Sequence, residues 1–84
     1  MTRKELITSL QKIIKPYAQN QEAIKNLSEG TNFINDLKIN SANLVDVILD
    51  VEDEFGIEID NESMEKMLSV KSAIDIIETK LAQN

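Results

Sequence analysis

The chain contains neither cysteine nor histidine among its 84 residues, and this absence limits both its fold and its chemistry. Disulfide bonds, thiolate zinc sites and imidazole metal sites are excluded, so none of these can hold the short chain together. Catalysis by Cys–His or Ser–His–Asp groups is excluded as well. A chain of this length buries little surface, so packing of apolar side chains must supply a stability of about 3–5 kcal/mol.

The composition is typical of a chain that folds by itself. Apolar residues make up 42% and charged residues 29% of the sequence, unlike the composition of disordered chains. We expect one small domain spanning residues 1–84, and a monomer. No apolar run is long enough to span a membrane, and the first residues lack a secretory apolar core and cleavage site. We therefore expect a cytoplasmic protein without membrane insertion.

Acidic residues dominate the middle of the chain and indicate its partners. Fifteen acids against nine bases give a net charge of −6. Nine of the acids lie between Ser41 and Glu65, where the sequence has no Lys or Arg. This stretch would repel a polyanion, so we expect a basic protein partner and no nucleic-acid binding. The alternative is that the acids only solvate the outer face of a helix.

Apolar residues recur at helical spacing in three segments, which predicts three longer helices. The first begins with the capping box of Thr2 and Glu5. It ends near Lys15, because Pro16 disfavours helical geometry in the residue before it. The last begins at Ser69, a residue type favoured at helix starts.

The middle helix is the most clearly marked of the three. Asn40 or Ser41 caps its start, and Gly56 ends it. Val45 and Leu49 lie on a flank between its apolar arc and its acids, where they either contact a partner or widen the buried stripe. The arc that should face the core comprises Leu44, Val47, Ile48, Val51 and Phe55.

Two connecting segments carry further structure. The connector from about residue 18 to residue 40 is long and contains apolar residues, which we expect to fill the core. Residues 20–29 within it could form a short helix. Residues 57–60 alternate like a strand but have no partner strand, so they read as an extended link.

A short helix over residues 61–67 completes the prediction, with Met64, Met67 and Leu68 facing inward. The predicted fold is all-α. It is a small four-helix bundle of three longer helices and one short helix, with a long structured first loop.

Nothing in the sequence predicts a self-contained active site, so we expect a protein that is not an enzyme, with no catalytic residue and no metal site. A calcium loop starting at Asp50 would place its glycine at the seventh position rather than the sixth. Two glycines cannot build a loop that cradles phosphate. A bundle of this size also offers no substrate cleft for a pair of catalytic carboxylates.

Ser41 has the most informative position of any hydroxyl. It opens the acidic helix, where free backbone N–H groups and the helix dipole favour an attached anion such as a phosphate ester. The alternative is that Ser41 is only a helix cap. If Asn40 is the cap instead, the Ser41 hydroxyl projects outward and is available to a modifying enzyme.

These segments together resemble the acyl carrier proteins, over essentially the whole chain. The specific features are a Phe-x-x-Asp-Leu loop, a helix-initial serine, and an acidic helix that ends in Glu-x-Glu-Phe-Gly-Ile-x-Ile. The matching stretches are residues 31–37, Asn40–Ser41, residues 51–59, and Val70, Ala73, Ile74, Asp75 and Ile77.

The resemblance implies that Ser41 carries a 4′-phosphopantetheine arm, transferred from coenzyme A by a phosphopantetheinyl transferase. The thiol of the arm would hold acyl groups as thioesters and supply the chemistry that the sequence lacks. Enzymes of fatty-acid or polyketide type with basic patches would dock on the second long helix. The docking residues implied are Val45, Asp46, Leu49, Glu52 and Asp53, and the acyl-pocket lining is Phe33, Leu44, Ile48, Val51, Met64, Met67 and Ala73.

The sequence departs from the family pattern around the serine. Family members typically read Gly-x-Asp-Ser-Leu, whereas residues 38–42 read Lys-Ile-Asn-Ser-Ala, and Asn43 stands where an acid is frequent. This departure suggests a specialised carrier that serves a dedicated pathway. Two alternatives are an aminoacyl or peptidyl carrier of the same fold and an unmodified acidic helical adaptor.

Overall fold

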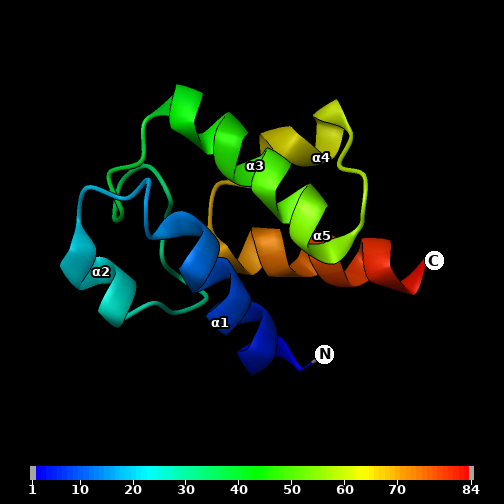
Figure 1. Ribbon diagram of the computed structural model, residues 1–84, viewed down its shortest axis with the longest axis horizontal. Helices are drawn as coiled ribbons and strands as arrows, with labels where there is room; N and C mark the ends of the chain where they lie inside the picture. Colours follow the sequence, from blue (N-terminus) through cyan, green and yellow to red (C-terminus); the bar gives the residue numbers. More distant parts are fainter. Residues whose placement is uncertain (1, 84) are drawn as a thin grey trace.

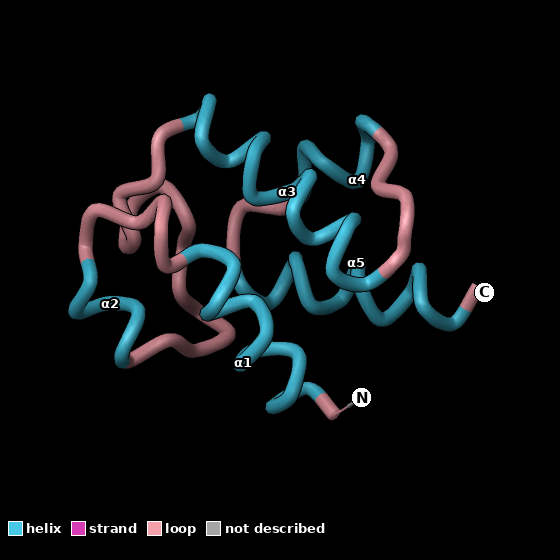
Figure 2. Tube along the Cα trace, viewed as in Figure 1, coloured by secondary structure: helices cyan, strands magenta, loops and turns pink. Residues whose placement is uncertain are grey.

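Five α-helices occur within residues 2–83, the part of the chain that this computed structural model describes (Figure 1). No strand occurs in the described part. The predicted all-α bundle is confirmed, with three longer helices and the short α4, and α2 is a further short helix inside the long first connector (Figure 2). The helices are α1 (Arg3–Ile14), α2 (Gln21–Lys25), α3 (Ser41–Phe55), α4 (Asn61–Lys66) and α5 (Val70–Ala82).

Side-chain caps fix where the helices begin, as the sequence predicted for α1 and α5. Thr2 Oγ1 accepts from the N–H of Glu5 at 3.1 Å, and Glu5 Oε1 accepts from the N–H of Thr2 at 3.0 Å. Ser69 Oγ accepts from the N–H of Ser72 at 3.2 Å at the start of α5. The left-handed Gly56 ends α3, because a residue without Cβ takes a positive φ at low cost.

The core lies where α1 packs against both α3 and α5, and α4 packs against α5. The apolar arc predicted on α3 is buried, apart from Phe55, which is partly buried. In the link 57–60, Ile57 and Ile59 are buried while Glu58 and Asp60 are exposed. The strand-like alternation of this link therefore has one side against the core and needs no partner strand.

The long first connector lies against the start of α5. Thr31 O accepts from the N–H of Val70 at 2.9 Å, and Glu29 O accepts from the N–H of Lys71 at 2.9 Å. The first turn of α5 thus finds acceptors outside its own helix. Phe33 and Leu37 of the connector are buried, which confirms that it fills the core.

Leu68 corrects one prediction. It was expected to face inward with Met64 and Met67, but the residue is 47% exposed. Helix α4 ends at Lys66, so the helical spacing that placed Leu68 on the inner face does not extend to it. Its carbonyl instead accepts from the N–H of Phe33 at 3.0 Å, while the side chain lies at the surface.

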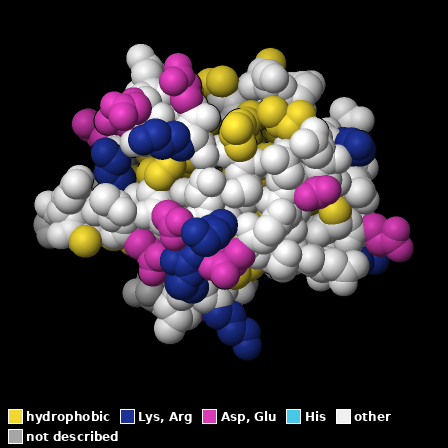
Figure 3. All heavy atoms as spheres, turned by 180° about the vertical axis from the view of Figure 1, so that it is seen from behind, with side chains coloured by type: hydrophobic (Ala, Val, Ile, Leu, Met, Phe, Trp, Pro, Cys, Tyr) yellow, Lys and Arg dark blue, Asp and Glu magenta, His cyan; other side chains and the backbone are white. Residues whose placement is uncertain are grey.

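An ion-pair cluster joins the start of α1 to the connector and to α5. Seen from behind, one region of the surface carries Lys and Arg side chains among Asp and Glu side chains (Figure 3). Arg3 Nε donates to Glu29 Oε1 at 2.8 Å, and Arg3 Nη1 donates to Asp75 Oδ1 at 3.1 Å and to Glu78. The cluster therefore links three segments that are distant in sequence.

Candidate functional site

Asn40, not Ser41, caps the start of α3. Its Oδ1 accepts from the N–H of Asn43 at 2.8 Å, and its carbonyl accepts from the N–H of Leu44 at 2.9 Å. Ser41 is therefore the first helical residue, and its side chain is exposed. Within residues 2–83 its hydroxyl makes no hydrogen bond. Because the neighbouring residue already caps the helix, the Ser41 hydroxyl is left available for modification.

The surroundings of Ser41 fit an attached phosphate group. The first turn of α3 contains no acidic residue. In the described part of the chain, the backbone N–H groups of Ser41 and Ala42 have no acceptor. These groups and the positive end of the helix dipole would both favour a negative charge on Ser41.

Lys38 precedes Ser41 in an unusual backbone conformation. Its φ is 59°, and it is the only residue other than glycine with a positive φ within residues 2–83. The buried side chains of Leu37 and Ile39 flank it. The backbone is held by hydrogen bonds from the N–H of Leu37 to Asn32 O and from the N–H of Ile39 to Phe33 O, both at 3.1 Å. This fixed turn leaves the Lys38 side chain exposed.

Four of the predicted docking residues lie exposed on α3. Val45 is 44% and Leu49 is 51% exposed, so they do not widen the buried stripe. Asp46 and Asp53 are exposed, and no Lys or Arg of residues 2–83 forms an ion pair with either. Apolar side chains beside acids without a cation form a surface that suits a basic, partly apolar partner.

Glu52, the fifth predicted docking residue, also has a structural contact. Its side chain is half-buried, and its Oε2 accepts from the N–H of Ile59 at 2.7 Å. This bond holds the link after α3 against the last turns of the helix. The spacing of acids along α3 could not reveal it, because the link returns to the helix only in the folded chain.

Tyr17 connects the end of α1 to the acidic face of α3. Its hydroxyl donates to Asp50 Oδ2 at 2.8 Å. This bond, followed by desolvation and by the negative charges of Asp50 and Asp46, raises the pKa of Tyr17 above its ordinary value. No pattern in the sequence indicates that Tyr17 has a partner on another helix.

The residues predicted to line an acyl pocket come together from the connector, α3, α4 and α5. All are buried in the core except Met64, which is partly buried and packs against it. An acyl chain among them would therefore have to displace side chains that now contact one another. A pocket at this place stays a prediction.

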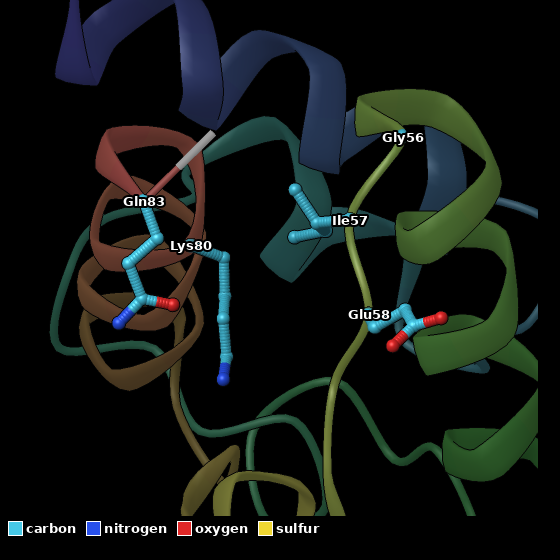
Figure 4. Close-up of a pocket in the computed structure, with 5 residues that line it drawn as sticks. All are labelled: Gly56, Ile57, Glu58, Lys80 and Gln83. Atoms are coloured by element: carbon cyan, nitrogen blue, oxygen red, sulfur yellow. The ribbon is translucent and has the colours of Figure 1, made fainter.

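An open hollow of about 350 Å³ lies elsewhere, beside the end of α5 (Figure 4). Lys80 and Gln83 of α5 line it together with Gly56, Ile57 and Glu58. Gly56 follows the last residue of α3, whereas Ser41 is the first, and the 15 residues of this helix span about 22 Å. The hollow is therefore separate from Ser41.

Within residues 2–83 no group of three or more carboxylates is arranged to hold a metal ion, and no helix is long and apolar enough to cross a membrane.

Known proteins resemble the chain over nearly its whole length, although no protein-family model matches it. An acyl carrier protein of Lactobacillus acidophilus is 39% identical over 80 residues, which cover 94% of this chain and 96% of the relative. An acyl carrier protein of Coprothermobacter proteolyticus is 33% identical over 81 residues, covering 96% of each.

Solved structures give the same result for the fold. The acyl carrier protein of Thermotoga maritima superposes with a TM-score of 0.81 at 30% identity, covering 96% of this chain and 92% of that one. The acyl carrier protein of Enterococcus faecalis gives a TM-score of 0.76 at 32% identity, with coverages of 95% and 99%.

Proposed function

Because the chain belongs to the acyl carrier protein family, we propose that it tethers acyl intermediates as thioesters on a 4′-phosphopantetheine arm attached to Ser41. The observation that carries the proposal is the exposed Ser41 hydroxyl at the start of α3, left free because Asn40 caps the helix. The arm, transferred from coenzyme A by a phosphopantetheinyl transferase, supplies the thiol that this sequence lacks.

The protein's own residues present the arm and recognise the enzymes that use it. Val45 and Leu49 offer apolar contact, and Asp46 and Asp53 offer charge to a basic patch on a partner. Exposed ion pairs contribute little each and are screened by salt, so docking should be weak and reversible. A carrier that visits successive enzymes needs such short-lived contacts.

In this proposal the chain acts as one carrier domain, a monomer in the cytoplasm, and catalyses no reaction itself. Its cargo is an acyl chain handled by enzymes of fatty-acid or polyketide type. The growing chain would be sheltered by the predicted pocket residues, which move apart to admit it. The Met64 and Met67 side chains suit this role, since methionine adapts to irregular contacts.

Mass spectrometry after incubation with coenzyme A and a broad-specificity phosphopantetheinyl transferase tests the attachment. We expect a mass gain of one phosphopantetheine, which Ser41→Ala abolishes. Ser9→Ala is the matched control and should keep the gain, because Ser9 lies in the middle of α1. No gain with several transferases would contradict the proposal and favour an unmodified acidic adaptor.

The docking surface is tested with the same transferase as the partner. Replacing Asp46 and Asp53 together by lysine should raise the KM for the carrier and leave the helical circular dichroism unchanged. The control replaces Glu22 and Glu65 by lysine, which changes net charge equally at exposed positions outside α3. Equal KM values for the two double variants would rule out a specific acidic docking face on α3.

A further inference from the structure

We infer that Lys38 binds the phosphodiester that joins the arm to Ser41, and so positions the arm at its root. The inference rests on the proposed attachment to Ser41 and assigns a new role to a residue of this chain. It starts from three observations: the conformation of Lys38, the charge around Ser41, and the free N–H groups at the start of α3.

The surrounding structure holds the backbone of Lys38 in the left-handed region, which lysine disfavours. A side chain with a Cβ is disfavoured at a φ of 59°, where glycine or asparagine is usual. The burial of Leu37 and Ile39 fixes the turn, and the N–H groups of Gln19 and Asn20 also donate to Leu37 O, at 3.1 and 3.2 Å. Lysine is thus held at a position where its backbone is strained and its side chain contributes nothing to the core. Strain of this kind points to a role for the side chain.

The charge pattern identifies what the Lys38 ammonium group would bind. Lys38 is the last base before the acidic stretch, and the next base in the sequence is Lys66. No carboxylate within residues 2–83 forms an ion pair with Lys38. The residues that flank Ser41 most closely are neutral, and the first acid after it is Asp46. Within four positions of Ser41 on either side, the sequence therefore contains one base, Lys38, and no acid.

The geometry allows the contact. Lys38 and Ser41 are three positions apart in the chain, so their Cα atoms are at most about 11 Å apart. Both side chains are exposed, and the flexible four-carbon stem of lysine can bring its ammonium group to a phosphate on Ser41 Oγ. The free N–H groups of Ser41 and Ala42 would bind the same phosphate from the helix side. Lysine and helix start together would restrict the directions in which the arm leaves the protein.

The experiment compares the modified protein with three variants by ³¹P NMR of the phosphodiester. Lys38→Asn and Lys38→Gly, which accept the left-handed backbone without the charge, should shift the phosphorus resonance. Lys38→Arg should keep the resonance close to that of the wild type. The difference should disappear at about 1 M salt, where the screening length falls to about 3 Å.

Lys4→Asn is the matched control. Lys4 is an exposed lysine in the first turn of α1, a helix end that lies far from the start of α3 (Figure 1). A wild-type resonance in Lys38→Asn at low salt, or an equal shift in Lys4→Asn, would overturn the role of Lys38. Failure of Ser41 to gain the arm would overturn the proposed function as well, and mass spectrometry separates that outcome from the first two.

Discussion

At the scale of single residues, the Tyr17 hydroxyl links the end of α1 to Asp50 on α3. Its ionisation can be measured by ultraviolet absorbance without overlap from other side chains. The chain has one tyrosine and no tryptophan. The pKa of Tyr17 is raised above its ordinary value in the folded state. At a pH between the unfolded and the folded pKa, the native protein therefore keeps a proton that the unfolded chain releases. This contribution to stability is therefore present below the unfolded pKa and is lost as the pH rises through the folded pKa.

Ultraviolet absorbance during an alkaline titration measures this pKa directly. We expect tyrosinate to form at higher pH in the native protein than in the urea-unfolded chain. Asp50→Asn should lower the native pKa, because it removes the charge next to the phenol. Asp53→Asn, on the same helix but without a Tyr17 contact, should leave the titration unchanged. Identical native and unfolded titrations would contradict the interaction.

The left-handed backbone at Lys38 makes a second prediction about one residue. Lys38→Gly should raise the free energy of unfolding by up to about 1 kcal/mol, because glycine removes the clash between Cβ and the backbone. Lys38→Ala keeps the Cβ, so its effect should stay within about 0.5 kcal/mol. Chemical denaturation of the unmodified variants separates the two results. Equal values for glycine and alanine would mean that the turn carries no such strain.

At the scale of the helix, two adjacent residues at the start of α3 differ in their roles: Asn40 caps the helix, and Ser41 presents a free hydroxyl. Asn40→Ala should lower the free energy of unfolding by about 1 kcal/mol, because it removes the side chain that caps the N–H of Asn43. Ser41→Ala should change it by less than about 0.5 kcal/mol, since the hydroxyl makes no hydrogen bond in the described chain. Urea denaturation of the two variants provides the comparison. A larger loss for Ser41→Ala would show that Ser41 is a structural cap.

Local signals account for most of the elements that the sequence predicted. Caps and helix-ending residues act within a few positions. The starts of α1 and α5 therefore follow from Thr2 and Ser69, and Gly56 sets the end of α3. Helical spacing likewise predicted that Val45 and Leu49 lie beside the core arc of α3.

Contacts between distant segments account for what the sequence did not reveal. The bond from Tyr17 to Asp50, and the acceptors that Glu29 and Thr31 offer to α5, exist only after α1 and the connector have packed. Leu68 was misplaced because its orientation depends on where α4 stops. For the site, the sequence placed Ser41 at the helix start, whereas the choice of Asn40 as the cap needed the folded geometry.

At the scale of the whole molecule, the Arg3 cluster links α1, the connector and α5, and makes this link pH-dependent. The guanidinium of Arg3 is the main cause that lowers the pKa of Asp75 below its ordinary value, and Lys71 adds to the effect. A carboxyl with a lowered folded pKa contributes stability above its unfolded pKa and loses it as the pH falls through the folded one. Acidification should therefore weaken the link.

Arg3→Gln tests this link. The variant should unfold at lower urea concentration than the wild type at neutral pH, and the two midpoints should converge as Asp75 becomes protonated. The caps at Glu5 and Asp60, whose pKa values are also lowered, mainly by their hydrogen bonds to Thr2 and Ser63, remain in both proteins. A constant difference between the midpoints at every pH would contradict an electrostatic origin.

The chain has a net charge of −6. The acids of α3 lower the stability of the fold by mutual repulsion, while they favour docking of a basic partner. Asp50 has Asp46 one turn before it and Asp53 one turn after it, and like charges at these spacings destabilise a helix by about 0.2–0.5 kcal/mol per pair. Asp53 also faces the negative end of the α3 dipole, where no basic residue compensates it. Asp46→Asn and Asp53→Asn should thus each raise the free energy of unfolding by about 0.3 kcal/mol. The same variants should raise the KM of the transferase for the carrier.

Asp75→Asn is the contrasting variant for this last prediction, because Asp75 has an ion-pair partner within the protein. It should lower the thermal midpoint and leave the transferase KM unchanged. If Asp46→Asn and Asp53→Asn instead lowered stability, the acids of α3 would have a role in holding the fold. If they raised stability while docking weakened, the acids would oppose folding, and binding of a basic partner would be the physical reason for their presence.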